Sequence, residues 1–292
     1  MLVLVCQRRA FTEVSQNHQC YGAPMHGVAR SKTAELAYSI EGAGTETVLL
    51  IMGLGGRAAD WGTAFPSALA TRFRVVRFDN RGVGKSPKAA AGYSLSDLAA
   101  DAVAVLDAVG AAKAHIVGIS MGGMIAQLVA LEHPERVGKL VLIATHAGGP
   151  NIEQMHPDAM KLFDPASLFG QKDPEAQIRR TLSVITAPGF VERSPEAVRE
   201  MLDQARAEPT HPTAFIAQFQ ALLASDRSER VKTITVPTLV IHGVEDKLIR
   251  PSNGRYLAEQ IPDARLAMLD DCGHIPMLEK PSELNALVLD FL

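Results

Sequence analysis

The sequence predicts an α/β protein with a mostly parallel central sheet, helices on both faces of that sheet, and an inserted helical cap. Three observations lead to this prediction. Apolar runs of strand length alternate with amphipathic runs of helix length in the first half of the chain and again near its end. This alternation stops in residues 145–231, where only amphipathic runs occur. A serine between two glycines, Gly118-Ile119-Ser120-Met121-Gly122, joins an apolar run to a helical one.

The composition favours one large domain that acts on a small molecule. A chain of 292 residues can bury a substantial core, and nothing in it requires a second independent domain. The net charge of -3 and the absence of long runs of like charge speak against a role in binding nucleic acid or anionic membranes. No apolar run approaches the roughly 18 residues of a membrane helix. We therefore expect a small-molecule partner, whereas the oligomeric state does not follow from the sequence.

The N-terminus and the cysteines indicate a cytoplasmic protein. Residues 1–23 lack a clear periodicity and are expected to form a loose extension. Their apolar run, Met1–Cys6, is too short for a secretory signal, and its charged residues follow it instead of preceding it. Cys6, Cys20 and Cys272 have neither paired nor metal-site spacing, which suits a reducing compartment.

Strands alternate with helices from residue 34 to residue 144. The predicted strands are the runs Ala34–Ile40, Val48–Met52, Phe73–Phe78, Ala114–Ile119 and Val137–Ala144. Apolar residues three or four positions apart predict the helices between them, around Phe65, in Leu95–Val109 and in Met121–Glu132. The run Val48–Met52 is apolar throughout, as expected of a strand that is covered on both faces. This order of elements predicts a mostly parallel sheet.

Residues 145–231 are predicted to form a helical cap over the carboxyl edge of the sheet. They contain no convincing buried strand, but amphipathic runs at 176–185, 195–207 and 212–224. Helices that pack away from the sheet edge are the alternative arrangement. The order of the cap helices does not follow from the sequence.

The strand pattern resumes after the predicted cap. Pro237–Gly243 and Ala264–Leu269 are predicted strands, and Pro281–Leu292 is a predicted final helix. The body of the fold is therefore expected to comprise residues 24–144 and 232–292.

Ser120 lies where a strand is predicted to turn sharply into a helix. Glycines at both second neighbours, Gly118 and Gly122, are typical of a nucleophile elbow, because side chains at these positions would collide in so tight a turn. Such a turn lifts the serine hydroxyl out of the sheet. An ordinary turn in a chain rich in glycine and alanine is the competing interpretation, so the context of Ser120 must decide.

A serine nucleophile needs a base, and the base needs a third group that orients it. Asp246 follows the strand that ends near Gly243, and His274 follows the strand that ends near Leu269. The order Ser120, Asp246, His274 is that of an α/β-hydrolase triad, and all three would lie at the same edge of a parallel sheet. We therefore predict these three residues as catalytic.

Two acidic residues near this pair are rivals for the acid. Glu245 is next to Asp246 on the same loop, and Asp271 is so close to His274 in sequence that it is expected to shape the turn instead. Backbone amides are expected to stabilise the oxyanion. The amide after the nucleophile, that of Met121, and the amide of Leu54 in the glycine-rich loop after the Val48–Met52 strand are the predicted donors.

From about Ala34 to Leu292 the chain resembles the α/β-hydrolase superfamily, among the esterase-like members with a Gly-X-Ser-Met-Gly-Gly elbow. The matching stretches are Met52–Gly55, Phe78–Ser86, Gly118–Gly123, Gly243–Asp246 and Gly273–His274. The resemblance implies the α/β-hydrolase fold, with a nucleophile, a base, an orienting acid and two oxyanion donors at Ser120, His274, Asp246, Leu54 and Met121 respectively. The chain has Met52 where these members usually have histidine, which removes a polar group from the pocket floor. It also resembles methylesterases of polyketide-type esters and, more loosely, enol-lactonases.

Two glycine-rich stretches imitate nucleotide-binding loops. Gly53–Ala58 follows a strand and fits a dinucleotide-binding pattern, with Asp79 at a suitable distance for a ribose contact, which would make the protein an oxidoreductase. This short match leaves Ser120, Asp246 and His274 unexplained. Gly82–Ser86 resembles a phosphate-binding loop, but the earlier glycine that this motif needs is Asp79. In the resembled family the second stretch is a structural loop that Asp79 and Arg81 would fix.

The sequence predicts a carboxylesterase-type serine hydrolase that cleaves an ester or a lactone through an acyl-enzyme, without metal or cofactor. A cofactor-free perhydrolase, a carbon-carbon bond hydrolase and an acyltransferase share the triad and remain alternatives, as does a non-catalytic ligand-binding relative. The residues that suggest an apolar acyl or alcohol pocket are Met155, Met160, Phe163, Leu168, Phe169, Phe215 and Phe219. Packing within the cap would explain many of them equally well.

Overall fold

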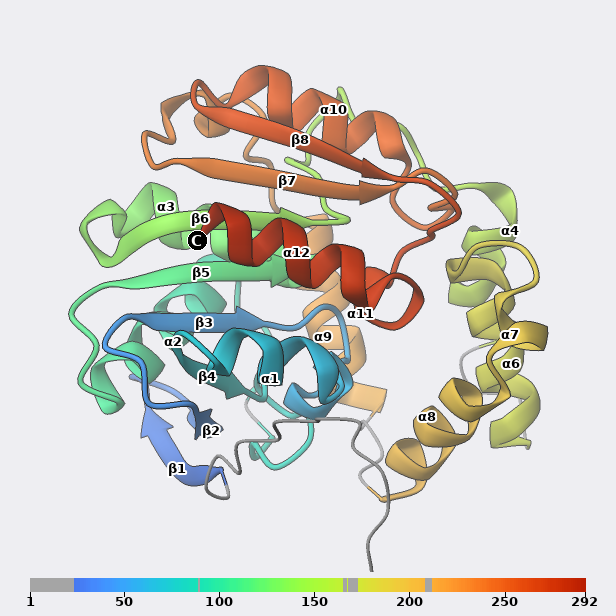
Figure 1. Ribbon diagram of the computed structural model, residues 1–292, viewed down its shortest axis with the longest axis horizontal. Helices are drawn as coiled ribbons and strands as arrows, with labels where there is room; N and C mark the ends of the chain where they lie inside the picture. The colour runs from blue at the N-terminus through green and yellow to red at the C-terminus, as the bar shows by residue number, and fades with distance from the viewer. Residues whose placement is uncertain (1–23, 89, 165–166, 168–172, 208–211) are drawn as a thin grey trace, which may run out of the picture.

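The structure is a computed structural model that describes residues 24–88, 90–164, 167, 173–207 and 212–292. The predicted N-terminal extension, residues 1–23, lies outside the described residues. The described chain forms one sheet flanked by helices, with a further group of helices beyond one edge of the sheet (Figure 1).

The sheet has eight strands in the order β1-β2-β4-β3-β5-β6-β7-β8. The strands are β1 (Met25–Arg30), β2 (Glu35–Glu41), β3 (Thr47–Ile51), β4 (Arg74–Phe78), β5 (Ala114–Ile119), β6 (Val137–Ile143), β7 (Thr238–Gly243) and β8 (Ala264–Leu269). The strands from β3 to β8 run parallel, while β2 pairs antiparallel with both β1 and β4. The predicted mostly parallel sheet is therefore confirmed.

Helices cover both faces of the sheet, as predicted. Helices α1 (Ala64–Ala70) and α12 (Pro281–Phe291) pack on one face, and α2 (Leu95–Ala108), α3 (Met121–Glu132) and α10 (Pro251–Gln260) pack on the other. Strand β3 shows the two-sided burial most clearly, because Leu49 and Ile51 belong to the core on the α3 side and Val48 and Leu50 to the core on the α12 side.

The sequence did not predict β1 and α10. Four of the six residues of β1 are exposed and only Ala29 is buried, so the strand has no apolar alternation. In α10 the buried residues are Asn253, Gly254 and Leu257, so apolar periodicity is weak there too. Both elements form because neighbouring strands and helices hold them in place.

In the described part of residues 145–231 the structure has helices and no strand. The α-helices there are α4 (Pro157–Met160), α6 (Pro174–Ile185), α7 (Phe190–Arg193), α8 (Pro195–Ala207) and α9 (Pro212–Leu223). Figure 1 shows α4, α6, α7 and α8 gathered beyond the carboxyl ends of the parallel strands, whereas α9 lies closer to the sheet and contacts α2. The domain boundaries at residues 144 and 232 stay a prediction.

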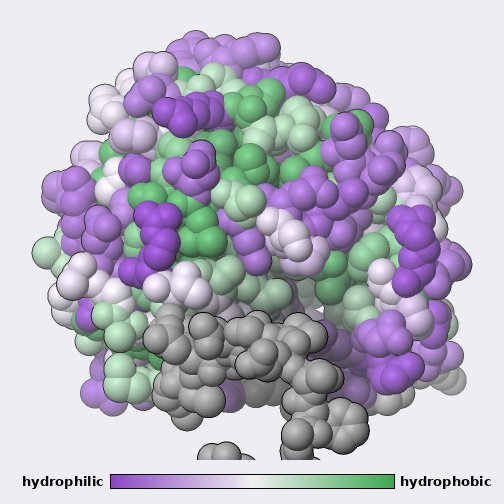
Figure 2. Space-filling model, in the orientation of Figure 1, coloured by the Kyte–Doolittle hydropathy of each residue, from purple (hydrophilic) through white to green (hydrophobic). Residues whose placement is uncertain are grey.

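Figure 2 shows polar and apolar residues intermixed over one face of the molecule. Within the described ranges, no helix is both long enough and apolar enough to span a bilayer.

Candidate active site

Ser120 occupies a strained turn between β5 and α3. Its backbone angles, φ 56° and ψ -123°, fall in a region that residues other than glycine rarely adopt. A Cβ atom on Gly118 would lie 2.2 Å from the carbonyl oxygen of Gly122, and one on Gly122 would lie 2.0 Å from that of Ile51. Both glycines are thus required by close backbone approach, for the reason expected from the sequence.

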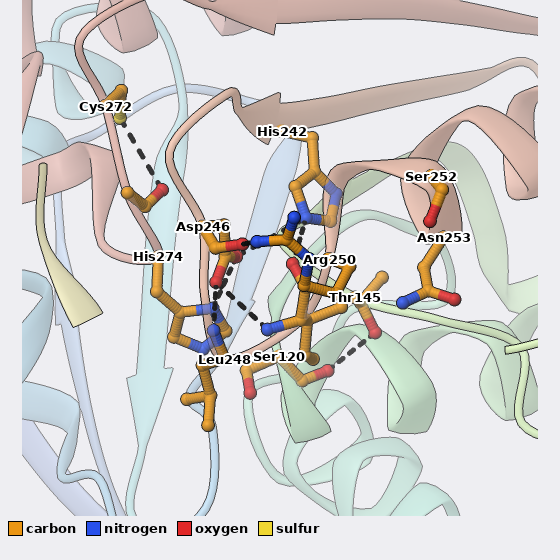
Figure 3. A network of polar contacts seen from close by, with 12 residues as sticks. Ser120, Thr145, His242, Asp246, Leu248, Arg250, Ser252, Asn253, Cys272 and His274 are labelled. Atoms are coloured by element: carbon orange, nitrogen blue, oxygen red, sulfur yellow. Dashed lines mark hydrogen bonds and ion pairs between the residues drawn. The ribbon is translucent and has the colours of Figure 1, made fainter. Parts of the chain in front are cut away.

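Hydrogen bonds hold the turn from both sides. The Ser120 amide donates to the Ile143 carbonyl at 2.9 Å. The Thr145 hydroxyl donates to the Ser120 carbonyl at 2.7 Å (Figure 3). Because both bonds use the backbone of Ser120, its hydroxyl remains available to a ligand.

Asp246 and His274 come together at the carboxyl ends of β7 and β8. The Nδ1 atom of His274 lies 2.8 Å from Oδ2 of Asp246, and both side chains are buried. The other carboxylate oxygen of Asp246 accepts hydrogen bonds from the backbone amides of Leu248 and Ile249, each at 2.9 Å. Figure 3 shows His274 between Asp246 and Ser120.

The environment of Asp246 favours its charged form. Burial opposes ionisation, but the neighbouring His274 and the hydrogen bonds from His242 and His274 outweigh it and lower the pKa of Asp246 to about 2. Asp246 is therefore a carboxylate at neutral pH. The rival acids Glu245 and Asp271 both line a separate surface hollow away from Ser120.

His242, whose contact with Asp246 the sequence analysis missed, lies on the opposite side of that carboxylate from His274 (Figure 3). Its Nε2 atom is 2.8 Å from the Ile249 carbonyl oxygen and 3.3 Å from Oδ2 of Asp246. Its Nδ1 atom is buried without a hydrogen-bond partner in the described part of the chain, so the tautomer with hydrogen on Nε2 fits this site. His242 sits in the apolar run of β7, and only the three-dimensional contact reveals its role.

The loop that carries His274 is tied to the helices of residues 145–231. The His274 amide donates to the Ile185 carbonyl at 2.6 Å. The Glu279 carboxylate accepts from the amides of Ala187 at 2.6 Å, Gly273 at 2.9 Å and Ile275 at 3.2 Å. The two residues that flank His274 are therefore fixed by one half-buried carboxylate.

The predicted oxyanion donors lie beside Ser120. In the described ranges, neither the Leu54 amide nor the Met121 amide donates a hydrogen bond to another residue. The loop of Leu54 is held by Gln218 of α9, which accepts from the Gly55 amide at 2.9 Å and donates to the Arg81 carbonyl at 3.3 Å. Gln218 is fully buried, and the sequence analysis gave it no role.

Two cavities meet at Ser120. The first, of about 400 Å³, is lined by Ser120, Leu54, Trp61 and His274, together with residues of α6 and α8. The second, of about 380 Å³, is also lined by Ser120 and Leu54, but on its other sides by Met121 and His146 and by residues of α9. A ligand held at Ser120 can thus extend in two directions.

A stack of three aromatic rings stands between these cavities. Phe163 lies 5.2 Å from Phe219 and 6.4 Å from Phe215, measured between ring centroids. Phe163 lines both cavities, Phe215 the first and Phe219 the second.

The remaining residues predicted for an apolar pocket have mixed outcomes. Met155 lines the second cavity, as the sequence suggested. Met160 does not, since it is 55% exposed on the surface. Leu168 and Phe169 lie outside the described residues.

Ser120 and His274 line the same cavity but are not hydrogen-bonded to each other in the described part of the chain. Such contacts are often long in the absence of substrate and tighten when it binds. Since Nδ1 of His274 faces Asp246, its Nε2 atom is the one free to act on the serine hydroxyl.

Asp79 holds one residue of each glycine-rich stretch in place. Asp79, the residue considered for a ribose contact, accepts hydrogen bonds from the amides of Ala58 at 2.7 Å and Lys85 at 2.9 Å. Arg81 forms a buried ion pair with Asp101. The expected structural role of Asp79 and Arg81 is confirmed. Among the described residues, no group of three or more histidine, cysteine or acidic side chains could hold a metal ion.

Comparison with known proteins gives the family. Residues 46–281 match the family model of the α/β-hydrolase fold. A protein of Variovorax paradoxus, provisionally named as the carbamate hydrolase RutD, is 33% identical over 260 residues, covering 88% of this chain and 96% of that protein. A 2-hydroxy-6-oxononadienedioate/2-hydroxy-6-oxononatrienedioate hydrolase of Paraburkholderia phymatum is 34% identical over 263 residues, covering 87% of this chain and 90% of the other.

A solved structure shows the same architecture. The enol-lactonase from Burkholderia xenovorans LB400 matches with a TM-score of 0.77 at 27% sequence identity, over 91% of this chain and 99% of that one. The family match spans most of the chain, and these relatives are named as hydrolases. The chain therefore belongs to the α/β-hydrolase family.

Proposed function

We propose that this hydrolase cleaves a carboxylic ester or a lactone through an acyl-enzyme, with Ser120 as nucleophile, His274 as base and Asp246 as orienting acid. The observation that carries the proposal is the 2.8 Å contact between Asp246 and His274, because His274 lines the same cavity as Ser120. Ser120 itself lies on a strained turn. Strain of this kind is characteristic of functional sites.

The geometry suits a two-step reaction. The Ser120 oxygen attacks the carbonyl carbon while its proton passes to Nε2 of His274, and the Asp246 carboxylate stabilises the resulting imidazolium. The amides of Leu54 and Met121 donate to the oxyanion of the tetrahedral intermediate. The leaving alcohol takes the proton from His274, and a water molecule then attacks the acyl-enzyme by the same route to release the acid and restore Ser120.

The charges around the cavities support a substrate without two carboxylates. Of the described residues that line either cavity, one is an arginine or lysine, Arg180. Four lining residues are acidic, namely Asp60 and Glu200 in the first cavity and Glu153 and Asp226 in the second. Asp60 pairs with Arg57 and Glu153 with Arg250, so Arg180 is the single lining arginine or lysine among the described residues that could meet a substrate carboxylate. Two carboxylates on one substrate would lack matching cations, which disfavours a dianion.

Carbon-carbon bond hydrolysis is the second candidate, because the relative from Paraburkholderia phymatum, at 34% identity, is named for a dioate substrate of that type. The same triad would serve this reaction. The scarcity of cations among the described lining residues is the reason to place the ester first.

Ser120→Ala should abolish labelling by a fluorophosphonate and lower the turnover of aryl esters by at least about 10³-fold. The matched control is Ser183→Ala, at an exposed serine of α6 that lines neither cavity. A panel of esters, lactones and a 2-hydroxy-6-oxo dioate would separate the two candidate functions. Unchanged ester turnover in Ser120→Ala would end the proposal.

A further inference from the structure

A histidine outside the proposed triad faces the second cavity. His146 lies in the loop after β6 and lines this cavity together with Ser120. The sequence analysis gave it no role. Its position places an imidazole within the same hollow as the serine hydroxyl.

The hydrogen bonds of His146 define which ring nitrogen carries hydrogen. The Gly148 amide donates to Nδ1 of His146 at 2.9 Å, so Nδ1 is an acceptor without hydrogen. The hydrogen of the neutral ring is therefore on Nε2. Among the described residues, Nε2 of His146 has no hydrogen-bond partner. It is also not among the fully buried polar atoms that lack a partner, so it is accessible to solvent. Its N–H group is therefore available to a ligand in the cavity.

A buried arginine fixes the loop that presents His146. Arg227 is 1% exposed and donates from Nη2 to the His146 carbonyl at 3.3 Å. It also donates from Nε to Gln127 at 3.2 Å, and Gln127 in turn donates to the same carbonyl at 3.2 Å. The His146 backbone is thus held by two side chains, which limits how far the ring can move.

Arg227 and burial also keep the imidazole neutral. Removal from water, followed by the positive charge of Arg227 and the nearby His242, lowers the pKa of His146 to about 4. The acidic residues on this cavity are engaged elsewhere, Glu153 with Arg250 and Ser252, and Asp226 with Ser228. His146 is therefore a neutral hydrogen-bond donor near pH 7.

We propose that the Nε2–H group of His146 recognises a second oxygen in the acyl part of the substrate, so that the preferred esters carry a keto or similar acceptor group a few carbons from the scissile carbonyl. This inference rests on the proposed ester hydrolysis. It assigns the second cavity to the acyl group and the first to the leaving group.

The position of His274 supports this assignment. His274 must give its proton to the leaving oxygen, and it lines the first cavity but not the second. The leaving group is therefore placed in the first cavity. The acyl chain then extends into the second, past the Met121 amide and toward His146.

The test compares matched pairs of 4-nitrophenyl esters: 3-oxobutanoate with butanoate, 4-oxopentanoate with pentanoate, and 5-oxohexanoate with hexanoate. For each pair, kcat/KM of the oxo ester is divided by that of its parent, after correction for their uncatalysed hydrolysis rates. In at least one pair this ratio should fall tenfold or more in His146→Leu, which removes the donor. His146→Gln, which retains an N–H donor, should recover part of it.

His156→Leu is the control, because it makes the same chemical change outside both cavities. Like His146, His156 accepts a hydrogen bond at Nδ1 from a backbone amide, that of Asp158, at 3.2 Å. Its substitution by leucine should leave every ratio unchanged, because His156 lines neither cavity. Equal ratios in the wild type and His146→Leu for all three pairs would overturn the inference while leaving ester hydrolysis intact.

A second comparison tests the acyl assignment, with 3-oxobutyl butanoate against butyl butanoate. If His146→Leu lowers the ratio of this pair and not those of the aryl esters, the recognised oxygen belongs to the leaving group and the assignment is wrong. If the wild type hydrolyses none of the parent esters and resists the fluorophosphonate, the proposed function fails and this inference fails with it.

Discussion

The half-buried carboxylate of Glu279 shows how a single side chain can position His274, the proposed base. It accepts hydrogen bonds from the amides of Gly273 and Ile275, on both sides of His274, and from the amide of Ala187 in the neighbouring helical segment. We expect Glu279→Gln to lower the free energy of unfolding by about 1–3 kcal/mol, because one of the two acceptor oxygens becomes a donor that faces another N–H group. Urea denaturation measures this loss, and kcat on an aryl ester should fall with it.

Glu283→Gln is the matched control for this prediction. Glu283 is an exposed residue of α12 whose carboxylate, among the described residues, pairs with Lys280 alone, at 3.8 Å. Its substitution should change the stability by less than about 0.5 kcal/mol. Equal stabilities of the Glu279 and Glu283 variants would show that the Glu279 carboxylate does not fix the loop.

At the scale of elements, α9 joins the proposed oxyanion loop to the cavities. Its Gln218 holds the Gly55 amide, while its Phe215 and Phe219 stack with Phe163 between the two cavities. Because Phe163 lines both cavities, its removal should join them. We expect Phe163→Ala to raise kcat/KM for 4-nitrophenyl octanoate relative to the butanoate by about fivefold or more.

A chain-length series of aryl esters measures this change in preference. Ile216→Ala is the control, since Ile216 lies on α9, is 40% exposed and lines neither cavity. A preference that is the same in Phe163→Ala and the wild type would mean that the aromatic stack does not limit the acyl or alcohol part of the substrate.

The parts that the sequence predicted are those that depend on local patterns. Strand β3, helix α3 and the glycines around Ser120 follow from apolar runs and from close backbone approach within a short stretch. The role of Gln218 could not be predicted in this way, because a polar residue on a helix is usually exposed and its hydrogen-bond partner Gly55 is 163 positions away in the sequence. His146 and His242 were missed for the same reason: each acts through a partner or a cavity that only the folded chain assembles.

At the scale of the whole molecule, the site joins elements that are distant in sequence. The turn after β5 supplies Ser120, the ends of β7 and β8 supply Asp246 and His274, and the helices between β6 and β7 shape both cavities. The proposed reaction centre thus rests on the sheet, while the surfaces that would select a substrate belong largely to residues 145–231. This division explains why the sequence predicted the chemistry in more detail than the substrate.

The buried ionisable groups make the stability of the molecule depend on pH. The pKa of His146 is lowered to about 4 by burial, Arg227 and His242, with Asp226 and Glu153 also on the cavity wall. Between pH 6.5 and 4 the unfolded chain therefore binds a proton that the native protein does not, so the native state loses stability as pH falls through this window. The lowered pKa of Asp246, about 2, adds a further loss only below about pH 4.

Replacing His146 should remove the first of these two losses and leave the second. In the wild type, each pH unit below about 6.5 should cost up to about 1.4 kcal/mol of unfolding free energy from this one proton. His146→Leu lacks the titrating ring and does not suffer this loss. The unfolding free energy of the wild type minus that of the variant should therefore decrease as the pH is lowered from 7 to 5. Urea denaturation at pH 7, 6 and 5 measures it. Parallel pH profiles for the two proteins would mean that His146 titrates alike in the folded and unfolded chains, and that the buried surroundings of the second cavity do not hold it neutral.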